Sequence, residues 1–279
     1  MTGYTRILWL SACVMAALLA GSAPASASYV NMTGPLNYTI YNNGTVFLGK
    51  VGPGQTFFIT ISANTTNSTG ARFSRGWDEL LASNLPPGWV AENSSLYLAY
   101  EFVKITPPPD TTTGIYQLNL TAVNIGNYSK LGSLHFTALI NVTPDVFKLG
   151  VSPAQVSTGP GEPIPIYISV NNTGVSDSPF VISASGLPAW NTTEQVIALH
   201  HTTGVFQYPI YEDEPGNYTA NITVSSLESP LIRKSTVVGL TVQASLAGDY
   251  SALGEGALAF PVIYEPAYAV MYIISRIFG

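Results

Sequence analysis

The sequence predicts an all-β protein with two tandem β-sandwiches and a C-terminal apolar segment that we expect to be helical. Short runs of alternating apolar and polar residues fill the chain and are divided by Gly, Pro, Asn and Ser. This pattern is typical of half-buried strands separated by turns. Amphipathic helical periodicity is lacking before the C-terminus. A set of turn and aromatic landmarks also occurs twice along the chain, which indicates two copies of one domain.

The predicted strands carry β-branched or aromatic residues at alternate positions. They cover residues 38–41, 45–48, 57–61, 115–122, 164–170, 205–210, 218–224 and 235–242. The first two flank Asn42, Asn43 and Gly44. Because Asn and Gly accept positive φ angles, we expect a tight hairpin there.

Three landmarks recur in the same order, with offsets of 107, 101 and 102 residues. They are Gly-Pro-Gly at 52–54 and 159–161, a Leu-Pro corner that ends in Trp89 and Trp190, and Gly-x-Tyr ending at Tyr116 and Tyr218. We expect the Gly-x-Tyr landmark to begin the last long strand of each copy. The repeat then divides the chain into a signal peptide at 1–27, sandwiches at 28–145 and 146–245, and a linker with an apolar anchor or docking segment at 246–279.

The landmarks, with the Asn172-Thr173-Gly174 turn and the start of a strand at Pro215-Gly216-Asn217-Tyr218, resemble the CARDB-like and NPCBM-associated immunoglobulin-like modules of prokaryotic cell-surface proteins, many of them archaeal. The likeness covers residues 50–125 and 155–226. It implies an immunoglobulin-like sandwich in each copy and a role as a spacer or adhesion unit. The first copy departs from the pattern by inserting residues 67–82, so we expect a specialised outer loop there.

The N-terminus is typical of a secretory signal peptide. Arg6 precedes an apolar run at 7–20, and Ala25-Ser26-Ala27 offers a cleavage site of small residues. Cleavage there would remove Cys13, the only cysteine, so we expect a mature chain without disulfides or thiolate ligands. Residues 10–13 also resemble a lipoprotein box, and lipidation at Cys13 is the alternative.

Thirteen of the seventeen asparagines stand in Asn-X-Ser/Thr sequons, although only about a fifth of the residues are Ser or Thr. Each occupied sequon must lie on a surface exposed to a glycosylating secretory route. The alternative explanation is that Asn and Thr are both common in polar turns. The predicted N-glycosylation sites are Asn31, Asn37, Asn43, Asn64, Asn67, Asn93, Asn119, Asn127, Asn141, Asn171, Asn191, Asn217 and Asn221. Asn64 aligns with Asn171 and Asn119 with Asn221, and strand alternation places both pairs on the outer face.

The composition argues against several functions. Only 9% of the residues are charged and the net charge is −6, so no basic stripe is present to bind nucleic acid. Phosphate-loop, dinucleotide and Gly-x-Ser-x-Gly motifs are also lacking, so we expect neither an enzyme nor a cofactor. Low charge threatens solubility, and we expect glycans to take the place of charge.

Candidate metal and ion-pair sites are few. His135 and the adjacent His200 and His201 lack the spacing of a zinc site, so we expect no metal and a solvated pair of loop histidines. The acids at 212–214 could offer oxygen ligands to Ca²⁺, but a solvated turn is the preferred interpretation. The charged residues at 72–79 are expected to form surface ion pairs, with a partner-binding loop as the alternative.

Trp77, Trp89 and Trp190 are candidate contacts for a carbohydrate or a protein partner. Trp89 and Trp190 belong to the repeated framework, so packing in the core or at its rim is the preferred interpretation. Stacking on a sugar is the alternative.

The tail at 257–278 is mostly apolar but contains Pro261, Glu265, Pro266 and Arg276. A spanning helix needs about twenty apolar residues, and a central Glu is costly in hydrocarbon. Three interpretations stay open: a kinked or re-entrant membrane anchor, a segment that docks into a neighbouring subunit, and a helix packed on its own sandwich. The residues expected to anchor or dock are Phe260, Tyr264, Tyr268, Tyr272, Ile273, Ile274 and Phe278.

The sequence thus predicts a secreted, N-glycosylated cell-envelope protein with a structural or adhesive function and a C-terminal anchor, and the resemblance suggests an archaeal source. Its expected partners are the membrane surface or an envelope protein bound through the tail, further copies of itself, and its N-linked glycans. The alternatives are a subunit of an extracellular filament or surface layer whose tail docks into a neighbouring protomer, and a carbohydrate-binding accessory module.

Overall fold

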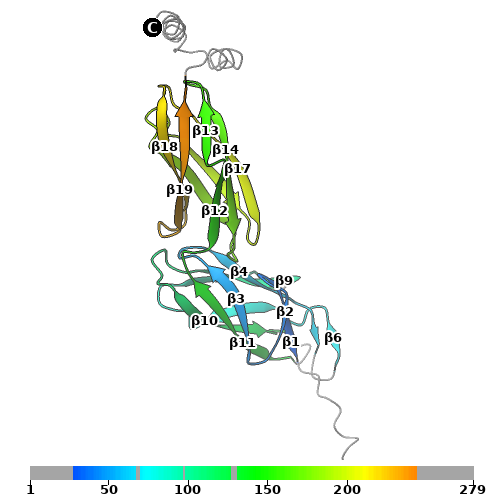
Figure 1. The fold of residues 1–279 in the computed structure, drawn as a ribbon. Helices are drawn as coiled ribbons and strands as arrows, with labels where there is room; N and C mark the ends of the chain where they lie inside the picture. Colours follow the sequence, from blue (N-terminus) through cyan, green and yellow to red (C-terminus); the bar gives the residue numbers. More distant parts are fainter. Residues whose placement is uncertain (1–27, 67–69, 97, 127–130, 244–279) are drawn as a thin grey trace, which may run out of the picture.

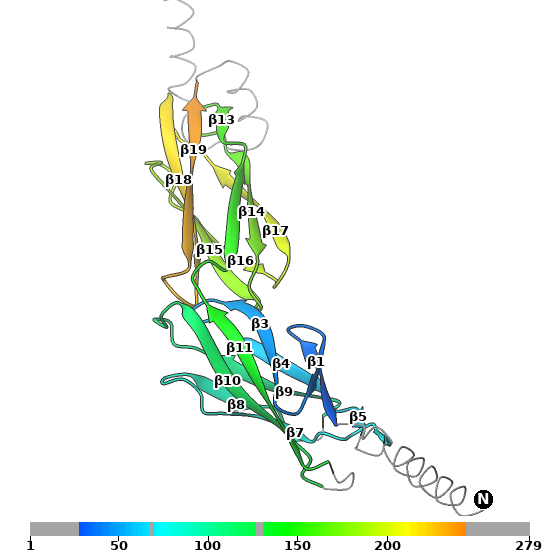
Figure 2. The same cartoon turned by 60° about the horizontal axis from the view of Figure 1, so that its bottom comes forward.

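The computed structural model describes residues 28–66, 70–96, 98–126 and 131–243, and over these ranges it contains strands and no helix. The strands form two β-sandwiches that follow one another along the long axis of the molecule (Figures 1 and 2). The prediction of an all-β protein with two tandem sandwiches is confirmed. The predicted signal peptide and the apolar tail, including its expected helix, lie outside the described residues.

The first sandwich packs a five-stranded sheet, in the order β2-β1-β4-β9-β8, on a four-stranded sheet, in the order β3-β11-β10-β7. Every pairing within these two sheets is antiparallel except that of β3 with β11. A two-stranded sheet pairs β5, just before the insertion at 67–82, with β6 inside it. The bounds are β1 Tyr29–Gly34, β2 Tyr38–Tyr41, β3 Gly44–Val51, β4 Phe57–Ser62, β5 Thr65–Thr66, β6 Arg72–Phe73, β7 Glu79–Ser83, β8 Val90–Asn93, β9 Tyr100–Thr106, β10 Gly114–Val123 and β11 Ser133–Val142.

The second sandwich packs a three-stranded sheet, β12-β14-β17, on a five-stranded sheet, β13-β19-β18-β15-β16. Here β13 runs parallel to β19, as β3 does to β11. The bounds are β12 Phe147–Ser152, β13 Gln155–Thr158, β14 Ile164–Asn172, β15 Ser178–Ser185, β16 Thr193–Ala198, β17 Thr203–Ile210, β18 Gly216–Ser226 and β19 Arg233–Val242.

Both sandwiches have the strand order of an immunoglobulin-like domain, in which the first, second and fifth framework strands form one sheet and the third, sixth and seventh form the other. Each also has a tyrosine corner. The hydroxyl of Tyr116 donates to the carbonyl oxygen of Thr112 at 2.9 Å, and that of Tyr218 donates to Glu214 at 3.0 Å. These tyrosines begin β10 and β18, which are the penultimate strands of their sandwiches. The expectation that they begin the last strand was therefore wrong.

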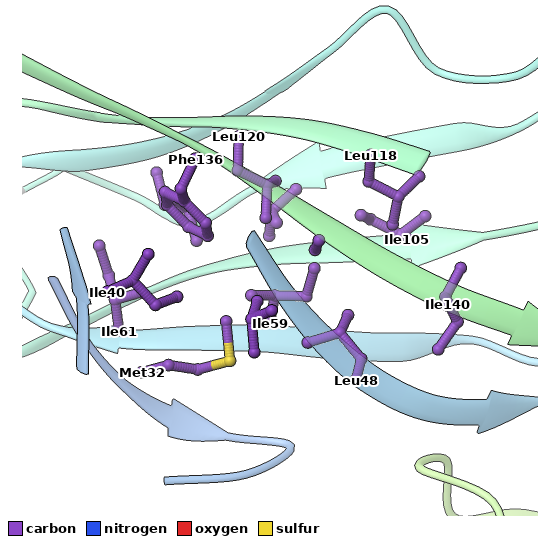
Figure 3. Close-up of a cluster of buried hydrophobic side chains, with 14 of the residues drawn as sticks. Met32, Ile40, Leu48, Ile59, Ile61, Ile105, Leu118, Leu120, Phe136 and Ile140 are labelled. Carbon is purple, nitrogen blue, oxygen red and sulfur yellow. The ribbon is translucent and has the colours of Figure 1, made fainter. Parts of the chain in front are cut away.

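Strand alternation fills each core from both sheets. Phe57, Ile59 and Ile61 on β4 are fully buried, and in Figure 3 Ile59 and Ile61 face Leu118 and Leu120 of β10. Burial of one such side chain contributes about 1.5–3 kcal/mol. The second core is built alike, and it contains Phe147 and Phe180 with ring centroids 4.8 Å apart. Without any cysteine among the described residues, these two cores carry the stability of the domains.

The predicted hairpin at residues 42–44 does not form. Asn43 does adopt a positive φ of 61°, but β2 pairs with β1 in one sheet while β3 pairs with β11 in the other. The turn therefore carries the chain from one sheet to the other. Local turn chemistry set the backbone angle, whereas the partners of each strand were set by burial of Ile40 and Val46 on opposite sides of the core.

The two domains meet through the first Gly-Pro-Gly turn. Gly54 has a φ of 74°, and a Cβ there would lie 2.5 Å from the carbonyl oxygen of Glu228 in the second domain. The buried Gln55 donates from its side chain to the hydroxyl of Ser178. The amide of Val175 donates to the carbonyl oxygen of Lys50 at 2.9 Å. These contacts hold the turn of one domain against the loops of the next.

Charge and apolar packing reinforce this joint. Asp145, between the domains, accepts from Lys234 of the second domain at 2.6 Å, and Lys50 of the first domain lies 4.0 Å from the same carboxylate. Val175 is buried in the core cluster of the first domain although it belongs to the second. The joint is therefore a packed interface and not only a covalent linker.

Candidate glycosylation surface

The sequon asparagines lie on the outside of the two sandwiches. Asn67 and Asn127 are outside the described residues, and the other eleven are exposed or half-buried, with none of them buried. Asn119 and Asn221 point outward from β10 and β18, because their neighbours Leu118, Leu120, Ala220 and Ile222 are all buried. The eleven asparagines are thus at the surface, which is where an N-glycan requires them to be.

The four asparagines outside sequons support the framework instead. Asn124 donates from Nδ2 to the carbonyl oxygen of Gly76 at 2.9 Å, and Asn172 donates from Nδ2 to those of Ser176 and Ala198 at 2.8 and 2.9 Å. Oδ1 of Asn42 accepts from the amide of His135 at 3.0 Å. Asn84 adopts a positive φ of 50°, which asparagine tolerates better than most residues.

Several sequon side chains accept through Oδ1, as Asn42 does, but unlike Asn124 and Asn172 they donate nothing from Nδ2. Oδ1 of Asn31 accepts from the hydroxyl of Thr39 at 2.9 Å, and Oδ1 of Asn217 accepts from Thr241 at 3.1 Å. Oδ1 of Asn119 accepts from the side chain of Gln117 at 3.2 Å. No Nδ2 of the eleven described sequon residues donates a hydrogen bond. The nitrogen that would carry a glycan is therefore uncommitted, and in Asn31, Asn119 and Asn217 the oxygen helps to orient the amide.

The tryptophans serve the framework. Trp77 is 1% exposed and donates from Nε1 to the carbonyl oxygen of Tyr29 at 3.1 Å. Trp89 is buried against Tyr116, with ring centroids 5.2 Å apart. Trp190 is half-buried and packs edge-on against Tyr211 at 4.8 Å. Contact between any of these rings and a carbohydrate stays a prediction.

Several charged residues do not behave as their sequence context suggests. Asp78 forms no surface ion pair; it is buried and accepts from the amides of Ile125 and Gly126 at 2.7 and 3.2 Å. Glu212 is not a solvated turn residue either, because it is buried and its carboxylate accepts from the amide of Ala189. His200, by contrast, is exposed in its loop as expected, and it donates from its backbone amide to Oδ1 of Asp177 at 2.7 Å, with Nδ1 2.6 Å from the same oxygen. Burial raises the pKa of Asp177, but the backbone and side-chain contacts of His200 outweigh this effect and lower the pKa overall. Over the described residues, no cluster of His, Cys, Asp or Glu could hold a metal ion.

Two buried carboxyl groups escaped the sequence analysis. Glu101 is fully buried, and its carboxylate accepts from Ser94 at 2.8 Å and from the amide of Leu98 at 2.7 Å. Burial raises the pKa of Glu101 despite these two bonds. Burial likewise raises the pKa of Glu228 at the joint, where Oε2 has no hydrogen-bond partner among the described residues. Strand alternation could have predicted that Glu101 faces inward, because its neighbours Tyr100 and Phe102 face outward. A charged residue is not expected in a core, so this pattern was not used in the sequence analysis.

The predicted anchor and docking residues at 260–278 lie outside the described residues. Within the described part of the chain, no helix has the length and apolar character needed to cross a membrane.

The arrangement defines the chain as a pair of immunoglobulin-like domains. No family model matches the sequence, and no curated protein matches it. Among solved structures it is similar to a chimeric titin Z1Z2 carrying an exogenous decorin peptide, at 15% identity and a TM-score of 0.36, over 79% of this chain and 100% of that one. The I9–I11 tandem of titin matches at 11% identity and a TM-score of 0.33, over 79% of this chain and 75% of that chain.

Fibronectin(III)-like modules of CbhA from Clostridium thermocellum are also similar, at 15% identity and a TM-score of 0.24, over 77% of this chain and 94% of that one. Because these likenesses are distant, the immunoglobulin-like assignment depends on the strand order and the tyrosine corners. Membership of the CARDB-like or NPCBM-associated group stays a prediction.

Proposed function

We propose that this chain is a secreted cell-envelope protein whose two immunoglobulin-like domains act as an N-glycosylated spacer or adhesion unit, held at the surface by the C-terminal segment. The observation that carries the proposal is the contrast between the sequon asparagines and the two buried asparagines of the framework. Every described sequon asparagine is accessible and keeps Nδ2 uncommitted, whereas Asn124 and Asn172 outside sequons are buried and donate from Nδ2. A glycan at either of the latter would break the framework.

The apolar residues on the outer faces favour the same interpretation. Ile115 is 68% exposed and stands directly opposite Asn141, and Val237 is 57% exposed and stands opposite Asn221. Directly opposed side chains on one face of a sheet lie within about 5 Å at Cβ. Glycans at these asparagines would cover apolar surface that a chain with few charges otherwise leaves in water.

The joint between the domains suits a spacer. A linker without contacts would let the domains reorient freely, whereas here Gln55, Val175 and Asp145 all make contacts across the joint. Such a joint would keep the two domains extended and would project the far end of the molecule away from its attachment.

Glycosylation is tested by mass spectrometry of proteolytic peptides from the protein secreted by a host that modifies Asn-X-Ser/Thr. In the reaction, Nδ2 bonds to the anomeric carbon of a sugar from an activated saccharide donor, and the Nδ2 proton and the donor's leaving group depart. We expect glycan mass on most of the eleven described sequons. An intact mass equal to that of the bare polypeptide would reject the proposal.

Attachment is tested by deleting residues 257–279 and fractionating the cells. A membrane anchor predicts that the full chain partitions with detergent and that the deletion releases a monomer. Fibres that are released by shear alone, or denaturant-resistant oligomers that the deletion abolishes, would instead support the filament alternative.

A further inference from the structure

We propose that the glycan at Asn31 packs on an aromatic surface of the protein instead of extending freely into solvent. This surface is the outer face of the sheet β2-β1-β4-β9-β8, and its aromatic members are Tyr29, Tyr41, Phe58, Tyr100 and Phe102. The inference rests on the proposed glycosylation and names what one of the glycans binds.

The strand register places Asn31 within this surface. Tyr29 is two residues away on the same strand, and Tyr41 is the direct cross-strand partner of Tyr29. On the other side Asn31 pairs with Ser62 of β4, and Ser62 pairs with Tyr100 of β9. Since residues two apart, and residues directly opposed, share one face of a sheet, the tyrosines flank Asn31 on that face. Only the small side chain of Ser62 lies between Asn31 and Tyr100.

The aromatic rings are available for contact. Tyr41 is 55% exposed, Tyr100 is 57% exposed and Phe58 is 48% exposed. Two edge-on pairs fix their arrangement, Tyr29 with Tyr41 at 6.4 Å and Phe58 with Phe102 at 5.7 Å between ring centroids. Aromatic side chains are costly to leave in water, so a surface with several of them favours a ligand that covers it.

The attachment point is held in place. Oδ1 of Asn31 accepts from Thr39 at 2.9 Å, which orients Nδ2. The carbonyl oxygen of Tyr29 accepts from the hydroxyl of Thr65 at 2.6 Å and from Nε1 of Trp77 at 3.1 Å. The buried Trp77 therefore fixes the strand that carries both the sequon and one of the flanking rings.

The chemistry of the ligand follows from the attachment. A pyranose presents C–H groups on its flat faces, and these pack on aromatic rings through apolar contact and weak C–H interactions. Neighbouring strands lie about 4.8 Å apart, which puts Tyr100 roughly 10 Å from Asn31. The first sugar would reach Tyr29 and Tyr41, and the following sugar would reach Tyr100.

Asn221 provides a matched comparison. It also projects from a central strand, but the side chains around it on its face are Thr219, Thr223, Val237 and Ser185, none of them aromatic. A glycan there has no ring to stack on.

The test is a double-mutant cycle on the secreted, glycosylated protein. Asn31→Gln and Thr33→Ala each remove the sequon at Asn31, Tyr41→Ser removes one ring, and Asn221→Gln removes the control glycan. One sugar–ring contact of the usual strength predicts that loss of the Asn31 glycan raises the unfolding equilibrium constant about 2–10-fold. Because Tyr41 also packs on Tyr29, Tyr41→Ser should raise the constant in either state, but by about 2–10-fold more when Asn31 carries its glycan. Asn221→Gln should raise the constant less than Asn31→Gln does.

A spectroscopic readout keeps the test valid if Tyr41→Ser fails to fold. In the unmutated protein, ring currents should shift the C–H protons of the first Asn31 sugar upfield relative to those of the Asn221 sugar. An occupied Asn31 with no coupling to Tyr41 and no such shift would overturn the aromatic contact while leaving glycosylation intact. An unoccupied Asn31 in the peptide mass spectra would reject both at this sequon.

Discussion

The two domains share a framework and differ in the strand that follows the Leu-Pro corner, which is β8 in the first domain and β16 in the second. In the first domain β8 pairs with β9 and extends the sheet that contains β1 and β4. In the second domain β16 pairs with β15 and extends the opposite sheet. The strands follow the same Leu-Pro corner, so the corner fixes a turn and a tryptophan position without fixing which sheet receives the next strand.

The two domains also differ in strands that are added at the edges of the sheets, whereas their framework turns are alike. The first domain adds β2 on the edge of β1 and the hairpin β5-β6 after β4, and its predicted specialised loop at 67–82 spans β6 and most of β7. The Gly-Pro-Gly turns, by contrast, are built alike, since the amide of Gly52 donates to the side chain of Gln55 at 2.7 Å and that of Gly159 donates to Glu162 at 3.3 Å. The framework positions persist because both cores depend on them, whereas the edges are free to change.

The largest expected effect is a difference in stability between variants of the two repeated tryptophans. Trp89→Ala empties a buried site in the first core and should cost about 3–5 kcal/mol of its unfolding free energy. Trp190→Ala should cost clearly less in the second domain, because Trp190 is half-buried and its Nε1 has no hydrogen-bond partner among the described residues. Urea denaturation of both variants checks the difference. Equal losses of unfolding free energy would show that the two tryptophans contribute equally to stability despite their different burial.

The next effect concerns the joint, which the first Gly-Pro-Gly turn makes and the second does not. Gly54→Ala introduces both a strained φ and a clash with the backbone of Glu228, and it should cost about 1–3 kcal/mol. Gly132→Ala is the control, because Gly132 has a similar φ of 67° with open space around it. Calorimetry should show the two domains unfolding more independently in Gly54→Ala than in Gly132→Ala. The same profile in both variants would mean that the joint does not couple the domains.

The smallest effect is a pH dependence at the joint. Burial raises the pKa of Glu228 above its ordinary value of 4.5, so the folded state holds a proton that the unfolded state releases. Stability should therefore fall as the pH rises from about 4.5 through the raised pKa. Glu228→Gln should raise the melting temperature at pH 7 and leave it unchanged at pH 3. Glu92→Gln, at an exposed residue paired with Lys104, is the control and should show no such gain at pH 7.

The sequence predicted the strands best where alternation was strict. Phe57, Ile59 and Ile61 were correctly placed in the core, and the strand-like stretches all lie within β-strands. It failed at Asp78 and Glu212, whose side chains were assigned to the surface but are buried. The backbone amides of Ile125, Gly126 and Ala189 that bind these two carboxylates lie 23 to 48 residues away along the chain, so no local pattern could reveal them.

For the candidate site, the sequence by itself determined which asparagines can carry glycans and, through the period of two, which of them face outward. Only the tertiary structure showed that their Nδ2 atoms are uncommitted and that Tyr29, Tyr41 and Tyr100 gather around Asn31. It also decided that the turn at residues 42–44 connects the two sheets of the first domain. The strands after the two Leu-Pro corners, β8 and β16, likewise join opposite sheets of their sandwiches for reasons that only the tertiary structure shows. Alternation is a property of each strand alone, whereas strand pairing depends on contacts between distant segments that together bury the two cores.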